Sequence, residues 1–190
     1  LVPATTYYFK IFPYANTGAQ INYKTDGPVP QVSKTTASLA DGYFVAFEQE
    51  GESKPVYGAG TLSLGGISWN LTEVMTGDEA SDFRIGNRSL RLRGYGTSEA
   101  AMLEDKMNGL GVLQFYYRRY GADAQVAWVA EYSQNEGESW TQIGDPFTAP
   151  SNDQVSKFTE IVNLTGSIRV RIRTQASTGT SNRRLNIDDI

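Results

Sequence analysis

Short stretches in which apolar and polar residues alternate recur along most of the chain. Leu90 and Leu92 alternate with Ser89, Arg91 and Arg93, and residues 169–173 repeat the pattern with Val170 and Ile172 between three arginines. Successive side chains of a β-strand point to opposite faces, so the pattern predicts strands whose apolar residues face a core. The five arginines of these two strands are predicted to point away from the core, and the two strands could share a basic outer face.

Ten such strands are expected after residue 42: Tyr43–Gln49, Gly66–Thr72, Ser89–Gly94, Ala100–Glu104, Gly111–Tyr120, Gln125–Ser133, Thr141–Gly144, Val155–Val162, Ser167–Thr174 and Arg184–Ile190. Turn-forming residues, among them Asn108-Gly109 and Glu136-Gly137, separate them. Sustained helical periodicity is scarce. The pattern predicts an all-β fold of the sandwich or jelly-roll type, and the lack of a repeat period argues against a propeller or solenoid.

The first 36 residues differ in character from the rest. Tyr7–Tyr14 and Gln20–Lys24 are strand-like with turn residues between them, which predicts a β-hairpin. The segment Asp26–Pro30 interrupts the second strand, and Ser33–Ser38 resembles a polar linker. The predicted organisation is a partial module over 1–36 followed by a sandwich domain over 37–190.

Residues Leu1-Val2-Pro3-Ala4-Thr5-Thr6-Tyr7 resemble the corner that opens the penultimate strand of fibronectin type III domains. The resemblance implies that Tyr7 hydrogen-bonds back across this corner and that the hairpin supplies the last two strands of such a domain. A two-stranded hairpin cannot bury a core by itself. The resemblance therefore implies that the parent protein extends further at its N-terminal side.

The remainder of the chain resembles the jelly-roll accessory modules of secreted bacterial proteins, related to galactose-binding-like, MAM-type and carbohydrate-binding domains. The resemblance rests on Phe47-Glu48, Trp69, Gly86–Arg93, Gly109–Tyr117 and Asn186–Ile190. It implies a module located outside the cell or at its surface, beside other domains of the same parent chain. Nuclease, peptidase or glycosidase activity of such a parent is not carried over to these residues.

Composition narrows the possible chemistry. The 190 residues include no Cys and no His, which excludes thiol chemistry, thiolate metal sites and every nucleophile activated by histidine. The net charge of −4 and the sequence pI near 4.9 argue against nucleic acid or an anionic membrane as a partner. No apolar run reaches the length of a membrane span, and no signal sequence opens the chain.

Carboxylate-pair chemistry remains open on composition alone, because Asp and Glu total 21. The acidic residues Asp78-Glu79, Asp82 and Glu104-Asp105 lie in stretches that resemble loops and form no recognisable acid–base signature. We therefore expect a protein that is not an enzyme, with a carboxylate-dependent glycoside hydrolase as the least favoured alternative.

Sugar recognition commonly uses an aromatic ring surrounded by polar side chains. The candidate ligand-binding residues are Tyr116, Arg118, Arg119, Tyr120, Trp128 and Tyr132. Tyr120, at a strand end, is the one most expected to be exposed. The competing interpretation is that these rings pack in the core, as aromatic residues of strands usually do.

The arginines allow two interpretations as well. Arg91, Arg93, Arg169, Arg171 and Arg173 could bind acidic glycans or phosphates through bidentate contacts. Alternatively they cover an outer sheet face and pair across strands with Glu131 or Glu160, which the acidic net charge favours.

A structural calcium ion is a further candidate. The resemblance to carbohydrate-binding jelly rolls implies that a Glu of the first strand and an acidic residue of the last strand hold it, which here indicates Glu48 with Asp188 or Asp189. Backbone carbonyls and waters would complete a shell of six to eight oxygens. The competing interpretation is a solvated edge carboxylate and an Arg-paired one.

The segment Ser133–Trp140 resembles the Asp-box turn of sialidase-like propellers, with Asn135 in place of the Asp. A single copy is typical of an isolated hairpin turn in which Ser133 and Asn135 bind the backbone and Trp140 packs beneath.

These features together predict a non-catalytic accessory module of a secreted or surface protein that binds carbohydrate or another extracellular polymer. The alternative is a structural spacer that positions a catalytic domain elsewhere in the parent protein.

Overall fold

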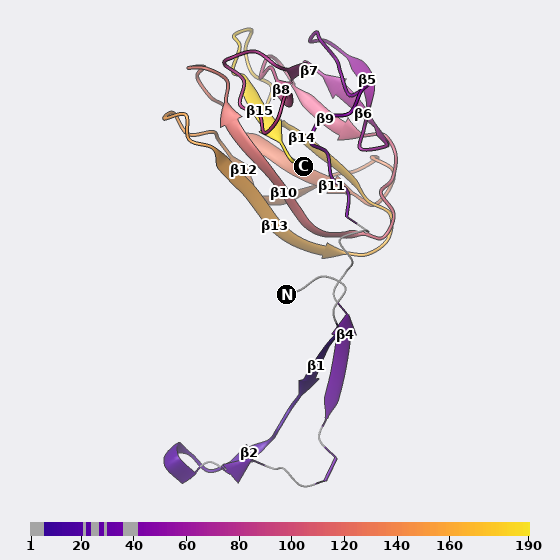
Figure 1. The fold of residues 1–190 in the computed structure, drawn as a ribbon, viewed down its shortest axis with the longest axis vertical. Coiled ribbons are helices and arrows are strands. Elements are labelled where there is room, and N and C mark those ends of the chain that lie inside the picture. The colour runs from indigo at the N-terminus through magenta and orange to yellow at the C-terminus, as the bar shows by residue number, and fades with distance from the viewer. Residues whose placement is uncertain (1–5, 21, 24–26, 29, 36–41) are drawn as a thin grey trace. The chain divides into compact units, whose positions relative to one another are not determined.

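The structure is a computed structural model that describes residues 6–20, 22–23, 27–28, 30–35 and 42–190. It divides into two compact units, Leu1–Gly42 and Tyr43–Ile190 (Figure 1). The corner Leu1–Thr5, on which the fibronectin resemblance begins, lies outside the described residues. Each unit is considered by itself.

The N-terminal unit is a narrow hairpin. Strand β1 (Thr6–Lys10) pairs antiparallel with β4 (Gln31–Thr35), so the first predicted strand is present but its predicted partner is wrong. The expected hairpin exists only as the short pair β2 (Tyr14–Ala15) and β3 (Asn22–Tyr23), with a 3₁₀ turn η1 (Gly18–Gln20) between them.

The difference has a local cause. The turn residues after Ala15 close only the two-residue pair, and the chain then returns so that the Ile11 N–H donates to the Pro30 carbonyl at 3.1 Å. The first part of the polar segment predicted as a linker, up to Thr35, belongs to β4 instead.

The C-terminal unit is a sandwich of two antiparallel sheets. One sheet has five strands in the order β13-β10-β15-β8-β7, and the other has six in the order β12-β11-β14-β9-β6-β5. Their bounds are β5 Gly60–Leu64, β6 Ile67–Thr72, β7 Val74–Gly77, β8 Ser89–Leu92, β9 Glu99–Met102, β10 Leu110–Arg119, β11 Trp128–Ser133, β12 Thr141–Phe147, β13 Ser156–Leu164, β14 Arg169–Thr174 and β15 Leu185–Asp188. The prediction of an all-β jelly-roll sandwich preceded by a hairpin is confirmed.

Nine of the ten expected strands are present, and two strands were missed. The expected strand Tyr43–Gln49 is wrong, because Phe47 adopts a positive φ of 59° and interrupts the extended backbone. Val45 nevertheless exchanges two backbone hydrogen bonds with Ile190, at 3.0 and 3.1 Å. The missed strands β5 and β7 are short and carry small or hydroxylated residues, so their alternation is weak.

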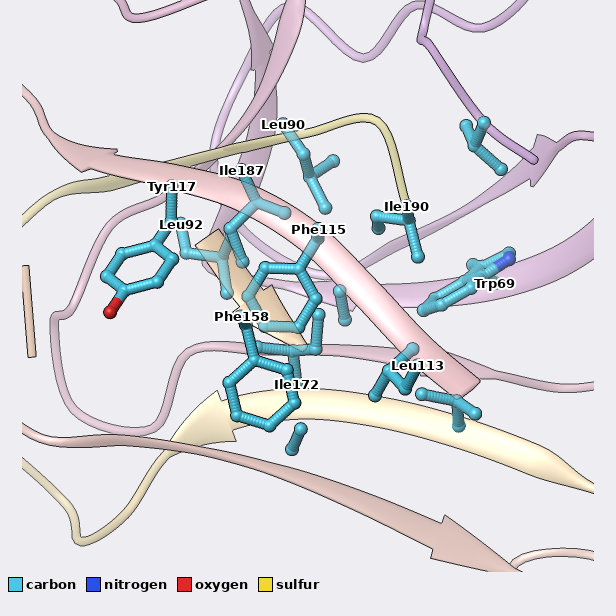
Figure 2. Close-up of a cluster of buried hydrophobic side chains, with 14 of the residues drawn as sticks. Trp69, Leu90, Leu92, Leu113, Phe115, Tyr117, Phe158, Ile172, Ile187 and Ile190 are labelled. Atoms are coloured by element: carbon cyan, nitrogen blue, oxygen red, sulfur yellow. The ribbon is translucent and has the colours of Figure 1, made fainter. Parts of the chain in front are cut away.

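The core fills the space between the two sheets (Figure 2). The rings of Phe115 and Phe158 are stacked with centroids 4.7 Å apart, and Phe147 lies against both. Trp69 and Ile172 come from the six-stranded sheet and have no exposed surface. Burial of such side chains is the main source of stability in a fold without disulfides.

Alternation correctly assigned the inward residues Leu90, Leu92, Val170 and Ile172, all buried in the core. The shared basic outer face is wrong, since β8 belongs to the five-stranded sheet and β14 to the six-stranded sheet. Arg91 also does not face solvent and is only 3% exposed. The described residues include no helix capable of crossing a membrane.

Candidate functional site

One row of side chains crosses the entire six-stranded sheet. Residues directly opposite one another on neighbouring strands join into a continuous row, which we call the polar row: Thr61, Asn70, Ala101, Arg171, Glu131 and Gln142. With neighbouring strands about 4.8 Å apart, the five intervals span roughly 24 Å. Ala101 is the only member without a polar side chain.

The polar row faces away from the core. The residues next to it along the strands, Trp69, Ala100, Ile172, Ala130 and Ile143, belong to the buried core. Because side chains alternate between the two faces of a strand, the members of the polar row lie on the opposite, outer face.

Ion pairs hold the charged part of this face in place. Glu131 accepts hydrogen bonds from Arg171 Nε at 2.5 Å and from Arg173 Nε and Nη2 at 2.9 and 2.8 Å. Arg171 also donates to Glu99 at 3.1 Å, and Arg169 pairs with Asp105 at 2.6 Å. Of the two structural partners expected for the arginines, Glu131 is confirmed, whereas the pairs of these arginines do not include Glu160.

Burial and pairing act in opposite directions on Glu131. Burial tends to raise the pKa of this carboxyl, but hydrogen bonds from Arg173 and Arg171 outweigh that effect and hold the pKa below its usual value. Glu131 is therefore ionised at neutral pH, and the two guanidinium groups are fixed by it on a rigid sheet.

An indole ring lies beside the polar row. The Arg171 guanidinium carbon is 4.3 Å from the centroid of Trp140, a cation–π distance. Trp140 is half-buried, and its Nε1 donates to the Gly137 carbonyl at 3.0 Å. The outer face thus combines an aromatic ring with hydrogen-bonding groups whose positions are fixed.

The turn that supplies Trp140 forms as the Asp-box pattern predicts. The Ser133 hydroxyl accepts from the backbone N–H groups of Asn135 and Gly137, and the Asn135 side-chain oxygen accepts from the Ser139 N–H. These bonds close the hairpin between β11 and β12, and they fix the position from which Trp140 reaches Arg171.

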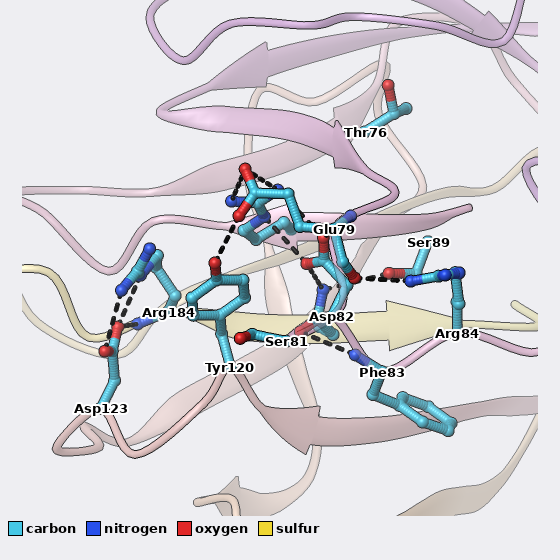
Figure 3. A network of polar contacts seen from close by, with 12 residues as sticks. Thr76, Glu79, Ser81, Asp82, Phe83, Arg84, Ser89, Tyr120, Asp123 and Arg184 are labelled. Atoms are coloured by element: carbon cyan, nitrogen blue, oxygen red, sulfur yellow. Dashed lines mark hydrogen bonds and ion pairs between the residues drawn. The ribbon is translucent and has the colours of Figure 1, made fainter. Parts of the chain in front are cut away.

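The outer face of the five-stranded sheet carries a second, more enclosed polar network (Figure 3). The segment between β7 and β8 covers Arg91, which pairs with Asp82 at 2.9 Å. The Asn186 side chain donates to both Asp82 and Ser89. An unpaired buried arginine would be costly, so the covering segment and this network stabilise each other.

Tyr120 belongs to that network and is not a free platform. Its hydroxyl donates to Glu79, and the guanidinium carbons of Arg184 and Arg91 lie 3.9 and 4.7 Å from its ring centroid (Figure 3). Arg184 is itself held by Asp123 at 2.7 Å. The ring is half-buried, so the greater exposure expected for it at the strand end is not observed.

The structure does not bring the predicted ligand-binding residues together. Tyr116 and Arg118 point outward from the five-stranded sheet, and Arg119 pairs with Asp153 at 2.7 Å. Trp128 has no exposed surface, which contradicts its assignment as a ligand-binding residue, and Tyr132 packs against the core. Both side chains face inward because they alternate along β11 in step with the buried Ala130. They therefore pack in the core and are not positioned to contact a ligand.

The candidate calcium ligands lie near one another where the start and end of the sandwich meet. Asp188 is fully buried, and its carboxylate accepts hydrogen bonds from the backbone N–H groups of Ile85 and Asp189. Burial raises the pKa of Asp188 to about 7, and the charges of Asp189 and Glu48 add to this effect. Hydrogen bonds from the backbone N–H of Arg88 and from the side chain of Asn87 lower the pKa of Glu48.

A cation would fit the charge of this corner. No cationic side chain pairs with Asp188 in the described part of the chain, and Glu48 and Asp189 carry charge of the same sign nearby. Within the same residues, no group of three or more carboxylates is already arranged around a metal position. A bound calcium would therefore need backbone carbonyls and waters for most of its shell.

Four of the acidic residues considered for glycosidase chemistry, Glu79, Asp82, Glu104 and Asp105, have structural partners. Asp82 pairs with Arg91, Asp105 pairs with Arg169, and Glu104 accepts from the Ser68 hydroxyl at 2.8 Å. These contacts explain their positions without a catalytic role.

Known proteins resemble this chain in structure but not in sequence. No protein-family model and no curated protein matches the chain. Solved structures similar to it include carbohydrate-binding modules, with TM-scores below 0.5.

The xylan-binding domain CBM22-1 of Paenibacillus barcinonensis Xyn10C shares 12% identity and a TM-score of 0.48, over 77% of this chain and 89% of that one. TmCBM61, solved with β-1,4-galactotriose, shares 13% identity and a TM-score of 0.43, over 64% and 84%. A mutant of the family 29 module CBM29-2 shares 12% identity and a TM-score of 0.44, over 70% and 86%. The ligands in these names are those of the neighbouring proteins and are not assigned to this chain.

Sequence reasoning missed the polar row as a site. The alternating arginines of β14 were visible, and so was Glu131, but nothing in the sequence paired β14 with both β9 and β11. Trp140 was interpreted only as the packing residue of its turn, and its contact with Arg171 depends on that unforeseen strand order.

Glu131→Gln should destabilise the sandwich by about 2 kcal/mol at pH 7, because it leaves Arg171 and Arg173 without their shared carboxylate. A carboxyl whose pKa is lowered by folding stabilises the fold above its unfolded pKa, about 4.3, and loses this effect as the pH falls through the folded value. Chemical denaturation from pH 7 to pH 3 should show the variant's deficit disappear at acid pH. The control is Glu50→Gln, an exposed site, and a deficit that persists unchanged at pH 3 would contradict the assignment.

Proposed function

We propose that the sandwich is a non-catalytic carbohydrate-binding module and that its polar row binds a glycan chain. The observation that carries the proposal is the row itself: hydrogen-bonding side chains on every strand but β9 of one outer sheet face, with Trp140 beside them. Sugar hydroxyls require fixed donors and acceptors, and the apolar C–H face of a sugar packs on an aromatic ring.

The geometry suits an extended ligand better than a compact one. The polar row runs perpendicular to the strands for roughly 24 Å, with the small side chain of Ala101 in its middle. Glu131, Arg171 and Arg173 hold one another in place, so little side-chain freedom is lost when a ligand binds. The role fits an accessory module of a secreted or surface bacterial protein, acting beside other domains of its parent chain.

A structural spacer is the second candidate. The enclosed network on the five-stranded sheet favours it, because Arg91, Asp82 and Asn186 are buried and serve stability alone. A spacer needs no ligand, so a binding experiment separates the two functions.

We propose further that a calcium ion is held by Glu48 and by Asp188 or Asp189. The support is the fully buried Asp188 carboxylate, which lacks a cationic partner in the described residues and lies near two other carboxylates. The ion would supply positive charge at the corner where Val45 and Ile190 meet. Its role would be to stabilise the fold.

For the N-terminal hairpin we propose the last strands of a fibronectin type III-like module. Large side chains lie exposed on it, with Tyr8 at 73%, Ile11 at 67% and Val32 at 62%. Monomeric proteins seldom leave so much apolar surface uncovered in one small element, so further β-strands are expected to cover it.

Binding to the polar row is tested by affinity electrophoresis and calorimetry against xylan, galactan and glucomannan. Asn70→Ala and Gln142→Ala together should weaken binding to the preferred glycan at least ~10-fold, because each removes polar contacts worth about 1 kcal/mol. Thr159→Ala, an exposed site on the five-stranded sheet, is the matched control and should bind normally. If no glycan binds the unaltered protein, the spacer function is favoured instead.

Calcium should raise the melting temperature of protein first stripped with EDTA by at least ~2 °C, since a ligand that binds only the folded state stabilises it. Glu48→Gln and the double variant Asp188→Asn, Asp189→Asn should each abolish the rise, whereas Glu50→Gln should retain it. Magnesium provides the second control, because it prefers a smaller, octahedral oxygen shell. An equal rise in the double variant would exclude the proposed site.

The hairpin proposal predicts that the sandwich folds without residues 1–42. The isolated segment 43–190 should unfold cooperatively with a midpoint within ~2 °C of the full chain, because its core is its own. In the 190-residue chain, amide hydrogen exchange should be fast in β1 and β4, because the further strands proposed to cover them are not bound. Strong protection of the β1 and β4 amides in the 190-residue chain alone would show that the hairpin needs no further strands.

A further inference from the structure

A pocket of about 460 Å³ opens at one end of the sandwich. None of its lining residues belongs to the polar row. Its walls come from the segment after β14, including Gln175, Ser177 and Thr178, and from Val126 and Ala127 before β11. Arg183 completes the lining and is its only charged residue. The volume is within the range that small ligands occupy in proteins.

The walls are held in place by hydrogen bonds. The Thr178 N–H donates to the Gly96 carbonyl at 2.8 Å, and its hydroxyl donates to the Gly94 carbonyl at 2.8 Å. The Gln175 N–H donates to the Ala127 carbonyl at 2.9 Å, which ties the two walls together. The pocket is thus preformed, and a ligand would not have to order it.

Arg183 differs from every other arginine of the chain. Its backbone N–H donates to the Arg93 carbonyl at 3.0 Å, but its guanidinium group has no ion pair or hydrogen bond within the described residues. Each of the other ten arginines donates to a carboxylate, a backbone carbonyl or both: Arg84, Arg88, Arg91, Arg93, Arg118, Arg119, Arg169, Arg171, Arg173 and Arg184.

The position of Arg183 rests on the backbone and not on its side chain. Gly94 has a positive φ of 63°, and a Cβ there would meet the Arg183 carbonyl oxygen at 2.4 Å. This close approach fixes the Arg183 backbone against the neighbouring loop. Arg183 is half-buried and lines the pocket, and its guanidinium donors have no partner among the described residues.

We propose that this pocket binds an anionic sugar residue, with Arg183 holding its carboxylate or sulfate group. A guanidinium group recognises planar or tetrahedral oxyanions through paired N–H donors. No carboxylate lines the pocket to compete for it. Ser177 and Gln175 offer partners for sugar hydroxyls, and Val126 and Ala127 offer an apolar wall for the ring.

The proposal extends the carbohydrate-binding function but uses other residues. The polar row carries paired charges and suits a neutral chain, whereas the pocket carries one unpaired positive charge. A glycan with occasional acidic residues could contact both, and each site can fail independently of the other.

The test uses the full chain labelled with ¹⁵N and three probes: trigalacturonate, neutral galactotriose and galactose 6-sulfate. Trigalacturonate or galactose 6-sulfate should shift the amide signals of residues 175–179, and comparison of the two anionic probes distinguishes carboxylate from sulfate. Galactotriose should leave those signals in place. Arg183→Gln should weaken anion binding at least ~10-fold while leaving the spectrum of the core unchanged.

Lys157→Gln is the matched control, because it removes the same charge from a residue outside the pocket lining. The double variant Asn70→Ala, Gln142→Ala should bind the anionic probes normally, which separates this site from the polar row. Unchanged affinity in Arg183→Gln, or equal shifts with galactotriose, would overturn the proposal. So would the absence of any shift in residues 175–179 with both anionic probes.

Discussion

Burial of one side of every strand between the two sheets is the constraint on which the rest of this molecule depends. Phe115, Phe158 and Trp69 can be covered only if their strands keep a fixed phase relative to the core. Once that phase is fixed, each outward side chain has a fixed place as well. The polar row exists because six strands hold the same phase across the sheet.

The two outer faces use that constraint differently. On the five-stranded sheet, the segment between β7 and β8 covers Arg91 and Asn186, and their donors are satisfied internally. On the six-stranded sheet the charged residues remain partly accessible and satisfy one another, as Glu131 does for two arginines. The first arrangement stabilises the fold. The second leaves ordered polar groups available to a ligand.

Local patterns in the sequence were sufficient for the all-β fold and for the inward direction of Leu90 and Ile172. They were also sufficient for the Asp-box turn, whose hydrogen bonds all lie within seven residues. They could not reveal the positive φ of Phe47, nor which strands lie side by side. The error over Arg91 has that origin, because its burial depends on residues 78–88 folding back over the sheet.

The candidate site shows the same division. Strand propensity made Trp128 and Tyr132 prominent, yet their phase sends both inward, whereas Trp140 gained its place through pairing of β11 with β14. The sequence could not distinguish Arg183 from the ten other arginines. It differs from them only because its side chain has no hydrogen-bond or ion-pair partner in the described part of the fold. Such properties arise only when distant segments meet.

The place of β15 has a consequence for how the protein is made. This last strand lies in the middle of its sheet, between β10 and β8, and Ile190 bonds to Val45 across 145 positions of the chain. During synthesis, β10 and β8 therefore have no common neighbour until β15 has left the ribosome. Until then the gap between β10 and β8 stays open, and wrong strand pairings can compete for it. The five-stranded sheet is therefore completed only when β15 enters between two strands that were made earlier.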